Sequence, residues 1–273
     1  MTLFEAVVLG VVQGLTEFLP ISSTAHLRIV PALLGWGDPG AAYSAVIQLG
    51  TVVAVLTAFW KDIVKLTRGF VRGLIDRKPF GTEESRLAWF VGLGTIPISV
   101  IGLLFKSAIK TSLRSLYVIS ASLIVLAIVL FVVERVASHK RTLSEMTLKD
   151  GLIVGLWQAL ALIPGSSRSG TTITGGLSLG LRREDAARYS FLLSIPATTL
   201  AGLLELKELI QATSRPDTSA LVVGTVVSFI AGIAAISGLL RFVKSRSMFT
   251  FVVYRIGLGL LLLGLLSAGV LQP

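Results

Sequence analysis

Long apolar runs alternate with short charged segments along most of the chain. Six runs are long enough to cross a bilayer, which takes about 20 consecutive apolar residues in a helix. The predicted transmembrane helices are Tyr43–Trp60, Leu87–Phe105, Leu116–Val133, Tyr189–Leu206, Ala220–Leu240 and Phe249–Val270. This pattern predicts an all-α polytopic membrane protein that forms one integral membrane domain over residues 1–273.

Two further apolar stretches, Leu3–Leu34 and Gly151–Leu181, are each interrupted in the middle by a sequence rich in proline and serine. Because each half is too short to cross a bilayer, each stretch is predicted to be a re-entrant helix–loop–helix. Irregular backbone at membrane depth is tolerated only where it is buried in protein or lines a polar cavity. The two interruptions therefore mark the expected position of a polar site.

The two interrupted stretches resemble each other. The first reads GVVQGLTEFLPISSTAHL from Gly10, and the second reads GLWQALALIPGSSRSGTTI from Gly155. The alignment pairs Gln13 with Gln158, Leu15 with Leu160, Pro20 with Pro164, and Ser22-Ser23 with Ser166-Ser167 after a one-residue gap. A second echo joins TIPISVIGLL from Thr95 to SIPATTLAGLL from Ser194. The similarity predicts an inverted-topology repeat, with copies over roughly residues 1–134 and 150–273 and a site where they meet.

Composition excludes several classes of protein. Hydrophobic residues make up 53% of the chain and charged residues only 15%, with a mean hydropathy of +0.83. A soluble domain carries about 25% charged residues, so a large soluble helical protein is excluded. The net charge of +10 comes from short segments between apolar runs, without the basic stripe of a nucleic-acid-binding protein. The absence of cysteine excludes disulfides and zinc–thiolate sites.

The basic residues are distributed unequally between the two predicted sides of the membrane. One side carries those of segments 61–86, 135–149, 182–188 and 241–246. The other side receives only Lys106, Lys110, Arg114, Lys207 and Arg215. The positive-inside rule assigns the first side to the cytoplasm. Both termini are then predicted to lie outside, and the two re-entrant elements enter from opposite faces so that their tips meet in mid-membrane.

Five ionisable residues fall inside the membrane-embedded elements: Glu17, His26, Arg28, Arg168 and Arg255. An ionisable group at the bilayer centre costs at least about 2.5 kcal/mol and is by default a functional-site hypothesis. For Arg28 and Arg255 the alternative is a side chain that reaches the interface or makes a structural pair.

The two interruptions carry different chemistry. The first contributes an acid, an imidazole and hydroxyls, which is typical of a reacting centre: Glu17, Ser22, Ser23, Thr24 and His26. The second is typical of an anion cradle, in which glycines admit close backbone approach and an arginine grips two oxygens. The predicted cradle consists of Gly165, Ser166, Ser167, Arg168, Ser169, Gly170, Thr171 and Thr172.

The segments QGLTEFLPISSTAH and PGSSRSGTT resemble the two signatures of the undecaprenyl-diphosphate phosphatases of the bacitracin-resistance type. The resemblance covers nearly the whole chain, including IQLGT at Ile47–Thr51 and the pair Tyr254-Arg255. It implies hydrolysis of a C55 isoprenyl diphosphate to the monophosphate, which recycles the lipid carrier of cell-wall synthesis. It also implies a divalent cation, Mg²⁺ or Ca²⁺, and a place in the bacterial plasma membrane with the active site open to the outer face.

The resemblance also assigns roles to residues. The essential serine, histidine and arginine of the family correspond to Ser23, His26 and Arg168. The Glu/Gln-x-x-x-Glu pattern is matched by Gln13 and Glu17, and glutamine at its first position leaves Glu17 as the only carboxylate, expected as base or metal ligand. Residues expected to bind substrate are Gln13, Ser22, Thr24, Gly165, Ser166, Ser167, Ser169, Gly170, Thr172 and Arg255.

The nucleophile is either Ser23 or His26. Ser23 is favoured because His26 then stays available for acid–base work. Ser23 and Ser167 are expected to face one pocket. Two other functions remain open: a lipid transporter or flippase, because inverted repeats with broken helices are transporter architecture, and a scaffold without chemistry. The expected partners are a polyprenyl diphosphate and the bilayer, without nucleic acid; the oligomeric state stays open, a homodimer included.

Overall fold

The computed structural model describes residues 1–110, 112–211 and 217–272, and these are helical apart from turns, loops and one bridge between Arg141 and Leu181. The helices are α1 (Leu3–Phe18), α2 (Ser23–Leu34), α3 (Gly40–Ala58), α4 (Trp60–Ile75), α5 (Glu83–Leu104), α6 (Lys106–Lys110), α7 (Leu116–Val136), α8 (Leu148–Ala159), α9 (Arg168–Ser178), α10 (Arg183–Gln211), α11 (Thr218–Ser245) and α12 (Phe249–Ser267). Short 3₁₀ turns are η1 (Ser112–Arg114), η2 (Leu143–Glu145) and η3 (Leu160–Leu162).

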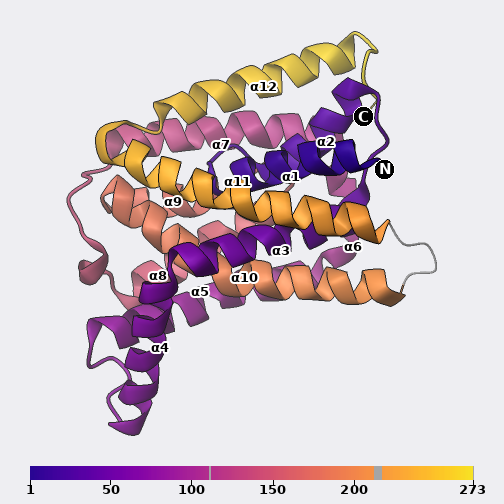
Figure 1. Ribbon diagram of the computed structural model, residues 1–273. Helices are drawn as coiled ribbons and strands as arrows, with labels where there is room; N and C mark the ends of the chain where they lie inside the picture. Colours follow the sequence, from indigo (N-terminus) through magenta and orange to yellow (C-terminus); the bar gives the residue numbers. More distant parts are fainter. Residues whose placement is uncertain (111, 212–216, 273) are drawn as a thin grey trace.

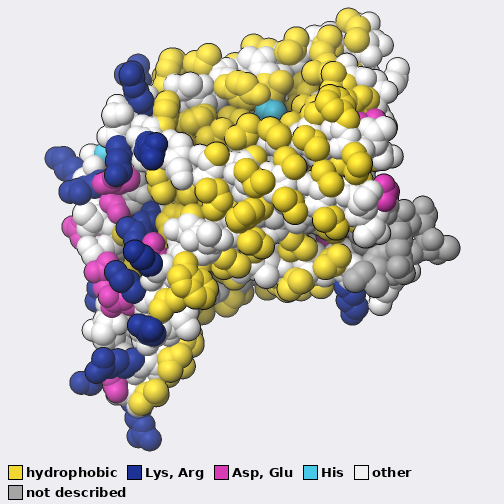
Figure 2. Space-filling model, in the orientation of Figure 1, with side chains coloured by type: hydrophobic (Ala, Val, Ile, Leu, Met, Phe, Trp, Pro, Cys, Tyr) yellow, Lys and Arg dark blue, Asp and Glu magenta, His cyan; other side chains and the backbone are white. Residues whose placement is uncertain are grey.

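Five helices, α5, α7, α10, α11 and α12, are long and apolar enough to cross a membrane, and the pair α3–α4 raises the number to as many as six if it is one span. Hydrophobic side chains cover the flank of the molecule over these helices (Figure 2). The protein is therefore an all-helical, multi-pass membrane protein. The predicted runs coincide with α3, α5, α7, α10, α11 and α12.

The segment between the first two predicted spans is not the loop that the sequence indicated. The chain bends by 76° after α3 and continues as α4, which projects from the bundle in Figure 1. Its apolar side chains Val71, Leu74 and Ile75 are exposed, and Lys61, Lys65, Arg68 and Arg72 recur among the apolar residues along the helix. This amphipathic pattern lowers the average hydropathy of the helix and hides it from a search for long apolar runs.

Both interrupted stretches fold as broken helices. The first forms α1 and α2 around a break at residues 19–22, and the second forms α8, η3 and α9 around a break at residues 163–167. In Figure 1, α1 and α2 lie toward the end that holds both termini, whereas α8 and α9 lie toward the opposite end. Lysine and arginine side chains gather on that opposite end (Figure 2). Arg215, predicted for the less basic side, lies outside the described residues.

Small residues hold the first half of each broken helix in place. A methyl group added at Gly14 of α1 would lie 2.5 Å from Ala231 Cβ and 2.6 Å from the carbonyl oxygen of Ser228 on α11. One added at Gly151 of α8 would lie 2.8 Å from Phe90 Cβ on α5. Glycine at such contacts allows two membrane helices to approach closely. The pairs α1–α11 and α8–α5 are thus built in the same way.

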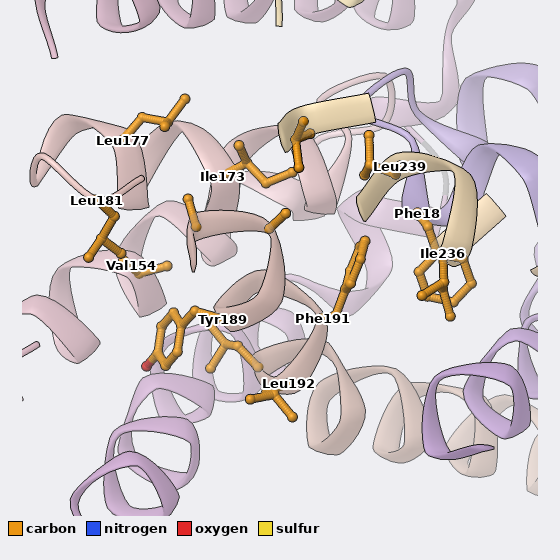
Figure 3. Close-up of a cluster of buried hydrophobic side chains, with 14 of the residues drawn as sticks. Phe18, Val154, Ile173, Leu177, Leu181, Tyr189, Phe191, Leu192, Ile236 and Leu239 are labelled. Carbon is orange, nitrogen blue, oxygen red and sulfur yellow. The ribbon is translucent and has the colours of Figure 1, made fainter. Parts of the chain in front are cut away.

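Aromatic rings pack within the buried hydrophobic core, where Figure 3 shows Phe18 and Phe191. The rings of Phe18 and Phe191 pack edge to face with centroids 5.4 Å apart, and Phe59 packs on Phe191 at 5.8 Å. Edge-to-face pairs of buried rings are favourable beyond the area that they bury. Because Phe18 follows the last polar residue of α1 and Phe191 lies within α10, the cluster fixes α1 against α10 beneath the site described next.

Candidate functional site

The two breaks have the same backbone conformation. Ser22 has φ 75° and ψ 101°, and Ser167 has φ 68° and ψ 109°, a left-handed region that residues other than glycine rarely adopt. Each serine caps the helix that follows, since its Oγ accepts from the third N–H beyond it, Ala25 N at 3.4 Å and Gly170 N at 3.1 Å. Strained conformations of this kind persist only where the surrounding structure enforces them and cluster at functional sites.

This correspondence corrects the sequence alignment of the two stretches. Ser22 is equivalent to Ser167, so Ser23 is equivalent to Arg168. The pairs Gln13–Gln158 and Leu15–Leu160 then follow at the same spacing, without a gap. The pairing of Ser22-Ser23 with Ser166-Ser167, which aligned the two prolines, is therefore wrong. The first residue of α2 is a hydroxyl and the first residue of α9 is a cation.

The carboxylate of Glu17 joins the two breaks. Its Oε2 accepts hydrogen bonds from Ser23 Oγ at 2.8 Å and from Gln13 Nε2 at 2.9 Å. Its Oε1 accepts from Arg168 Nη2 at 2.8 Å and from Gln48 Nε2 at 3.0 Å. Glu17 is only 6% exposed, so these four donors replace the water that a carboxylate would otherwise bind. The serine hydroxyl and the guanidinium are thereby held on opposite oxygens of one carboxylate.

Helix ends add to the electrostatics of this arrangement. Ser23 begins α2, which has 12 residues, and Arg168 begins α9, which has 11. The positive ends of two helices therefore converge on Glu17. A helix N-terminus carries about half a positive charge and unpaired N–H groups, which favour anions.

A cavity of about 350 Å³ opens beside the Glu17 carboxylate. Its polar wall includes Gln13, Glu17, Ser22, Ser23, Thr24, Ser167 and Arg168. Its apolar wall comes from α5, η3 and α10 and includes Ile98, Leu103, Leu162, Leu200 and Leu204. Ser23 and Ser167 thus face one cavity. A polar floor beside an apolar wall suits a ligand with a charged head and a hydrocarbon chain.

Most of the predicted cradle does not line this cavity: Gly165, Ser166, Ser169, Gly170, Thr171 and Thr172 lie behind it. Their polar groups join neighbouring segments instead. Ser169 Oγ donates to the carbonyl of Leu19 at 2.9 Å, and Gly165 N–H donates to Thr24 Oγ1 at 3.5 Å. These two contacts link the two breaks directly, because each runs from the first turn after one break into the other break.

His26 does not line the cavity, although the sequence made it a candidate nucleophile. Its Nδ1 lies 2.7 Å from the carbonyl oxygen of Ser22 and its Nε2 lies 2.6 Å from the hydroxyl of Tyr254. Because a carbonyl only accepts, Nδ1 carries the hydrogen, and the Nε2 of a neutral ring accepts from Tyr254. The ring stacks on Tyr254 with centroids 5.7 Å apart. In this arrangement His26 supports the strained backbone of Ser22.

Arg255 supports the second break in a corresponding way and does not line the cavity. Its side chain is 1% exposed, and Nη2 donates to the carbonyls of Ser166 at 2.9 Å, Gly165 at 3.3 Å and Ser122 at 3.4 Å. Neighbouring residues of α12, Tyr254 and Arg255, therefore reach the first and the second break respectively. The sequence indicated a substrate ligand at Arg255, whereas its hydrogen bonds are those of a backbone brace.

Sequence reasoning missed two residues of the site. Gln48 of α3 binds Glu17, and Tyr254 of α12 binds His26. The signal for Gln48 was an amide in the middle of an apolar run, where an unpaired polar group is costly. Tyr254 belongs to the pair Tyr254-Arg255 that forms part of the family resemblance, but its residue type indicated no role in the site, because tyrosine is common near membrane interfaces.

The residues present do not fit a divalent cation held by the protein alone. Among the described residues, no group of three His, Asp or Glu side chains is placed to hold a metal ion. Two of the described carboxylates line the cavity, Glu17 and Glu205, and of these Glu17 lies beside Ser23 and Arg168. Both oxygens of Glu17 already accept two hydrogen bonds each. Arg168 also lies 2.8 Å from it, where it would repel a second cation.

The fold and the site define a polytopic helical membrane protein with a buried Ser–Glu–Arg cluster where two broken helices meet. Residues 6–261 match the family described as bacitracin resistance protein BacA. The chain is 68% identical over 273 residues to a protein from Myxococcus xanthus (strain DK1622) named undecaprenyl-diphosphatase, covering 100% of this chain and 92% of the relative. A protein of the same name from Chlorobium phaeobacteroides (strain BS1) is 54% identical over 281 residues, covering 100% of both chains. The chain belongs to the BacA family.

The brace formed by Arg255 predicts a loss of stability when its side chain is shortened. Arg255→Lys retains the charge, but lysine is one bond shorter, so its Nζ stops short of the position from which Nη2 reaches three carbonyls, and the free energy of unfolding should fall by about 2 kcal/mol or more. Arg246→Lys, at an exposed position after α11, should unfold as the wild type does. Thermal unfolding in detergent measures both. A stable Arg255→Lys protein that binds substrate weakly would instead support the original assignment of Arg255 to substrate.

Proposed function

We propose that this protein hydrolyses undecaprenyl diphosphate to undecaprenyl phosphate and inorganic phosphate, which recycles the lipid carrier for cell-wall synthesis. The observation that carries the proposal is the carboxylate of Glu17, which holds Ser23 Oγ and Arg168 Nη2 at 2.8 Å each inside an amphipathic cavity. Its relatives named undecaprenyl-diphosphatase, matched over the full length of this chain, support the same reaction. The prenyl chain would lie along the apolar wall and the diphosphate on the polar floor.

Ser23 is the nucleophile in this mechanism. Its hydroxyl already donates to Glu17, so the carboxylate can accept the proton as Oγ attacks the terminal phosphorus. The bond from that phosphorus to the bridging oxygen breaks, and the lipid monophosphate leaves. Glu17 then gives the serine proton to the departing monophosphate. Water attacks the phosphoserine, Glu17 takes a proton from that water, and it returns the proton to Ser23 Oγ as the P–Oγ bond breaks and inorganic phosphate leaves.

Charge neutralisation is the main requirement of phosphoryl transfer, because the transition state spreads negative charge over the equatorial oxygens. Arg168 meets this requirement. Its Nη2 is bound to Glu17, and its Nε is buried without a partner in the described structure. The converging ends of α2 and α9 add to the positive potential. When substrate binds, its phosphate oxygens would accept hydrogen bonds from the Arg168 guanidinium, which donates to Glu17 in the free protein.

His26 acts as a positioning residue for Ser23. Both ring nitrogens are engaged, one by the carbonyl of Ser22 and the other by Tyr254, and His26 does not line the cavity. The hydrogen bond to Ser22 supports the left-handed conformation that aims the next residue, Ser23, at Glu17. This geometry supports the serine over the histidine as nucleophile.

A divalent cation, Mg²⁺ or Ca²⁺, belongs to the proposal as a companion of the diphosphate. Magnesium in particular is often bound by one or two carboxylates together with substrate phosphates. Bound there, it would neutralise phosphate charge. Among the described residues no group of three His, Asp or Glu side chains is placed to hold the ion, so a cation held chiefly by phosphate oxygens is the form that these residues support.

We also propose that the two broken helices are re-entrant elements of an inverted repeat. The pair α1–α2 corresponds to α8–α9, and the packing of α1 on α11 corresponds to that of α8 on α5. The echo between Thr95 and Ser194 lies on α5 and α10, which this correspondence does not superpose, so it carries no weight. The basic end would face the cytoplasm of a bacterial plasma membrane, with both termini outside.

A lipid transporter remains the second candidate, favoured by the meeting of two broken helices at one polar site. The two functions separate in proteoliposomes. A Ser23→Ala protein that still moves undecaprenyl phosphate across the bilayer would be a transporter, whatever its hydrolytic activity.

Purified protein should release phosphate from a C55 isoprenyl diphosphate, with loss of activity on chelation. Ser23→Ala should lower kcat by at least about a thousandfold because the nucleophile is gone. Arg168→Ala should lose phosphatase activity, and Arg168→Lys should retain only part of the wild-type activity, because the planar fork is lost.

Labelled substrate should leave acid-stable phosphate on Ser23. Acid-labile phosphate that survives base would instead identify His26, and full turnover in Arg168→Ala would remove the assigned role of the guanidinium.

The orientation predicts opposite results for two reporter fusions. A reporter that is active only outside should work when fused after Pro273 and fail when inserted at residue 77, between α4 and α5. A cytoplasmic reporter should give the reverse pattern. If the fusion at Pro273 behaves as cytoplasmic, the side from which the diphosphate enters is inverted.

A further inference from the structure

The charges on the cavity wall are not confined to the Ser–Glu–Arg cluster. The described residues of the wall include four basic side chains, Arg28, Lys106, Arg114 and Arg168, and two acidic ones, Glu17 and Glu205. Glu17 and Arg168 neutralise each other at the inner end. Arg28 and Arg114 are 24% and 26% exposed, against 10% for Arg168, so they lie in the outer part of the same cavity.

The guanidinium of Arg28 makes no hydrogen bond to any residue that the structure describes. Its one ion pair is loose, with Nε 3.7 Å from Asp38 Oδ2. An arginine presents five N–H donors in a planar fork, so an arginine with none of them engaged inside a cavity is poised for a ligand. The sequence left open whether Arg28 reaches toward the membrane interface or belongs to a functional site. In the structure Arg28 lines the cavity, which favours a functional site.

Asp38 holds Arg28 and Arg114 together without neutralising both. Arg114 Nη2 lies 3.1 Å and 3.3 Å from the two oxygens of this carboxylate. Asp38 also accepts from Gly40 N–H at 2.9 Å, which fixes the carboxylate at the start of α3. One carboxylate between two guanidinium groups leaves an excess positive charge. Arg28 belongs to α2 and Arg114 to η1, so the fold brings the two together from distant segments.

We infer that Arg28 and Arg114 form a second anion subsite in the outer part of the cavity, and that it takes a phosphate group. The inference rests on the proposed function for the source of that group, which is either the diphosphate head of the lipid or free phosphate. Paired guanidinium groups bind phosphate oxygens in a bidentate manner. A phosphate group that enters the cavity from water on its way to Arg168 would contact Arg28 and Arg114 first.

The test uses the double variant Arg28→Gln with Arg114→Gln, which replaces both guanidinium groups with uncharged amides. Phosphate release from the C55 diphosphate is measured in lipid nanodiscs. Inhibition by inorganic phosphate should weaken about fivefold or more, the KM should rise, and kcat should stay within about twofold. Asp38→Asn should act in the opposite direction and strengthen inhibition, because it removes the competing charge. Arg72→Gln is the matched control, since Arg72 also pairs with an aspartate, at 3.6 Å from Asp76, but lies on α4 away from the cavity.

The separate readouts distinguish the sources of the phosphate group. A change in KM alone assigns the subsite to the lipid head, and a change in phosphate inhibition alone assigns it to free phosphate. Unchanged KM and inhibition in the double variant would overturn the subsite. If the wild type released no phosphate, the proposed function would fail, and calorimetric titration with inorganic phosphate would still test the subsite. Binding to the wild type that the double variant loses supports it; equal binding overturns it.

Discussion

The site depends on the hydrogen bonds and the ion pair that the buried carboxylate of Glu17 accepts. A buried charge is costly unless it is paired and hydrogen-bonded, and Glu17 meets that requirement only by collecting donors from α1, α2, α3 and α9. Its ionisation therefore requires both broken helices and α3 to be in place. The same contact that stabilises the charge sets the hydroxyl of Ser23 and the guanidinium of Arg168 on either side of it.

The same backbone turn occurs before α2 and before α9, but it presents a different side chain in each case. Ser22 and Ser167 turn the chain in the same left-handed conformation and cap the next helix, and the residue that follows differs, serine in one copy and arginine in the other. Tyr254 and Arg255 on α12 then support the two breaks, the first through His26 and the second directly. Near-symmetric backbone thus carries an asymmetric pair, a hydroxyl and a cation, which is the pair that the proposed phosphoryl transfer would use.

The sequence predicted the membrane helices and the two breaks, because hydropathy leaves strong signals. It also made Glu17, Ser23 and Arg168 candidates for one site, and the structure brings the three side chains into contact. The sequence alignment of the two breaks was wrong because it paired Pro20 with Pro164, which are not equivalent. Only the backbone angles at Ser22 and Ser167 reveal the correct register. The sequence could not place His26 or Arg255, since a side chain's direction within an embedded helix follows from tertiary packing. The amphipathic α4 escaped notice because its charges mask its apolar residues.

The central claim is that the pairing of Glu17 with Arg168 couples the two broken helices. A double-mutant cycle with Glu17→Gln and Arg168→Met tests it most directly, read out as the free energy of unfolding in detergent. Each single variant leaves one buried charge unpaired and should lose about 3 to 5 kcal/mol. The double variant should be more stable than the sum of the two losses predicts, by at least about 2 kcal/mol, while remaining inactive. Losses that simply add would contradict the claim, because they would mean that the two residues act independently.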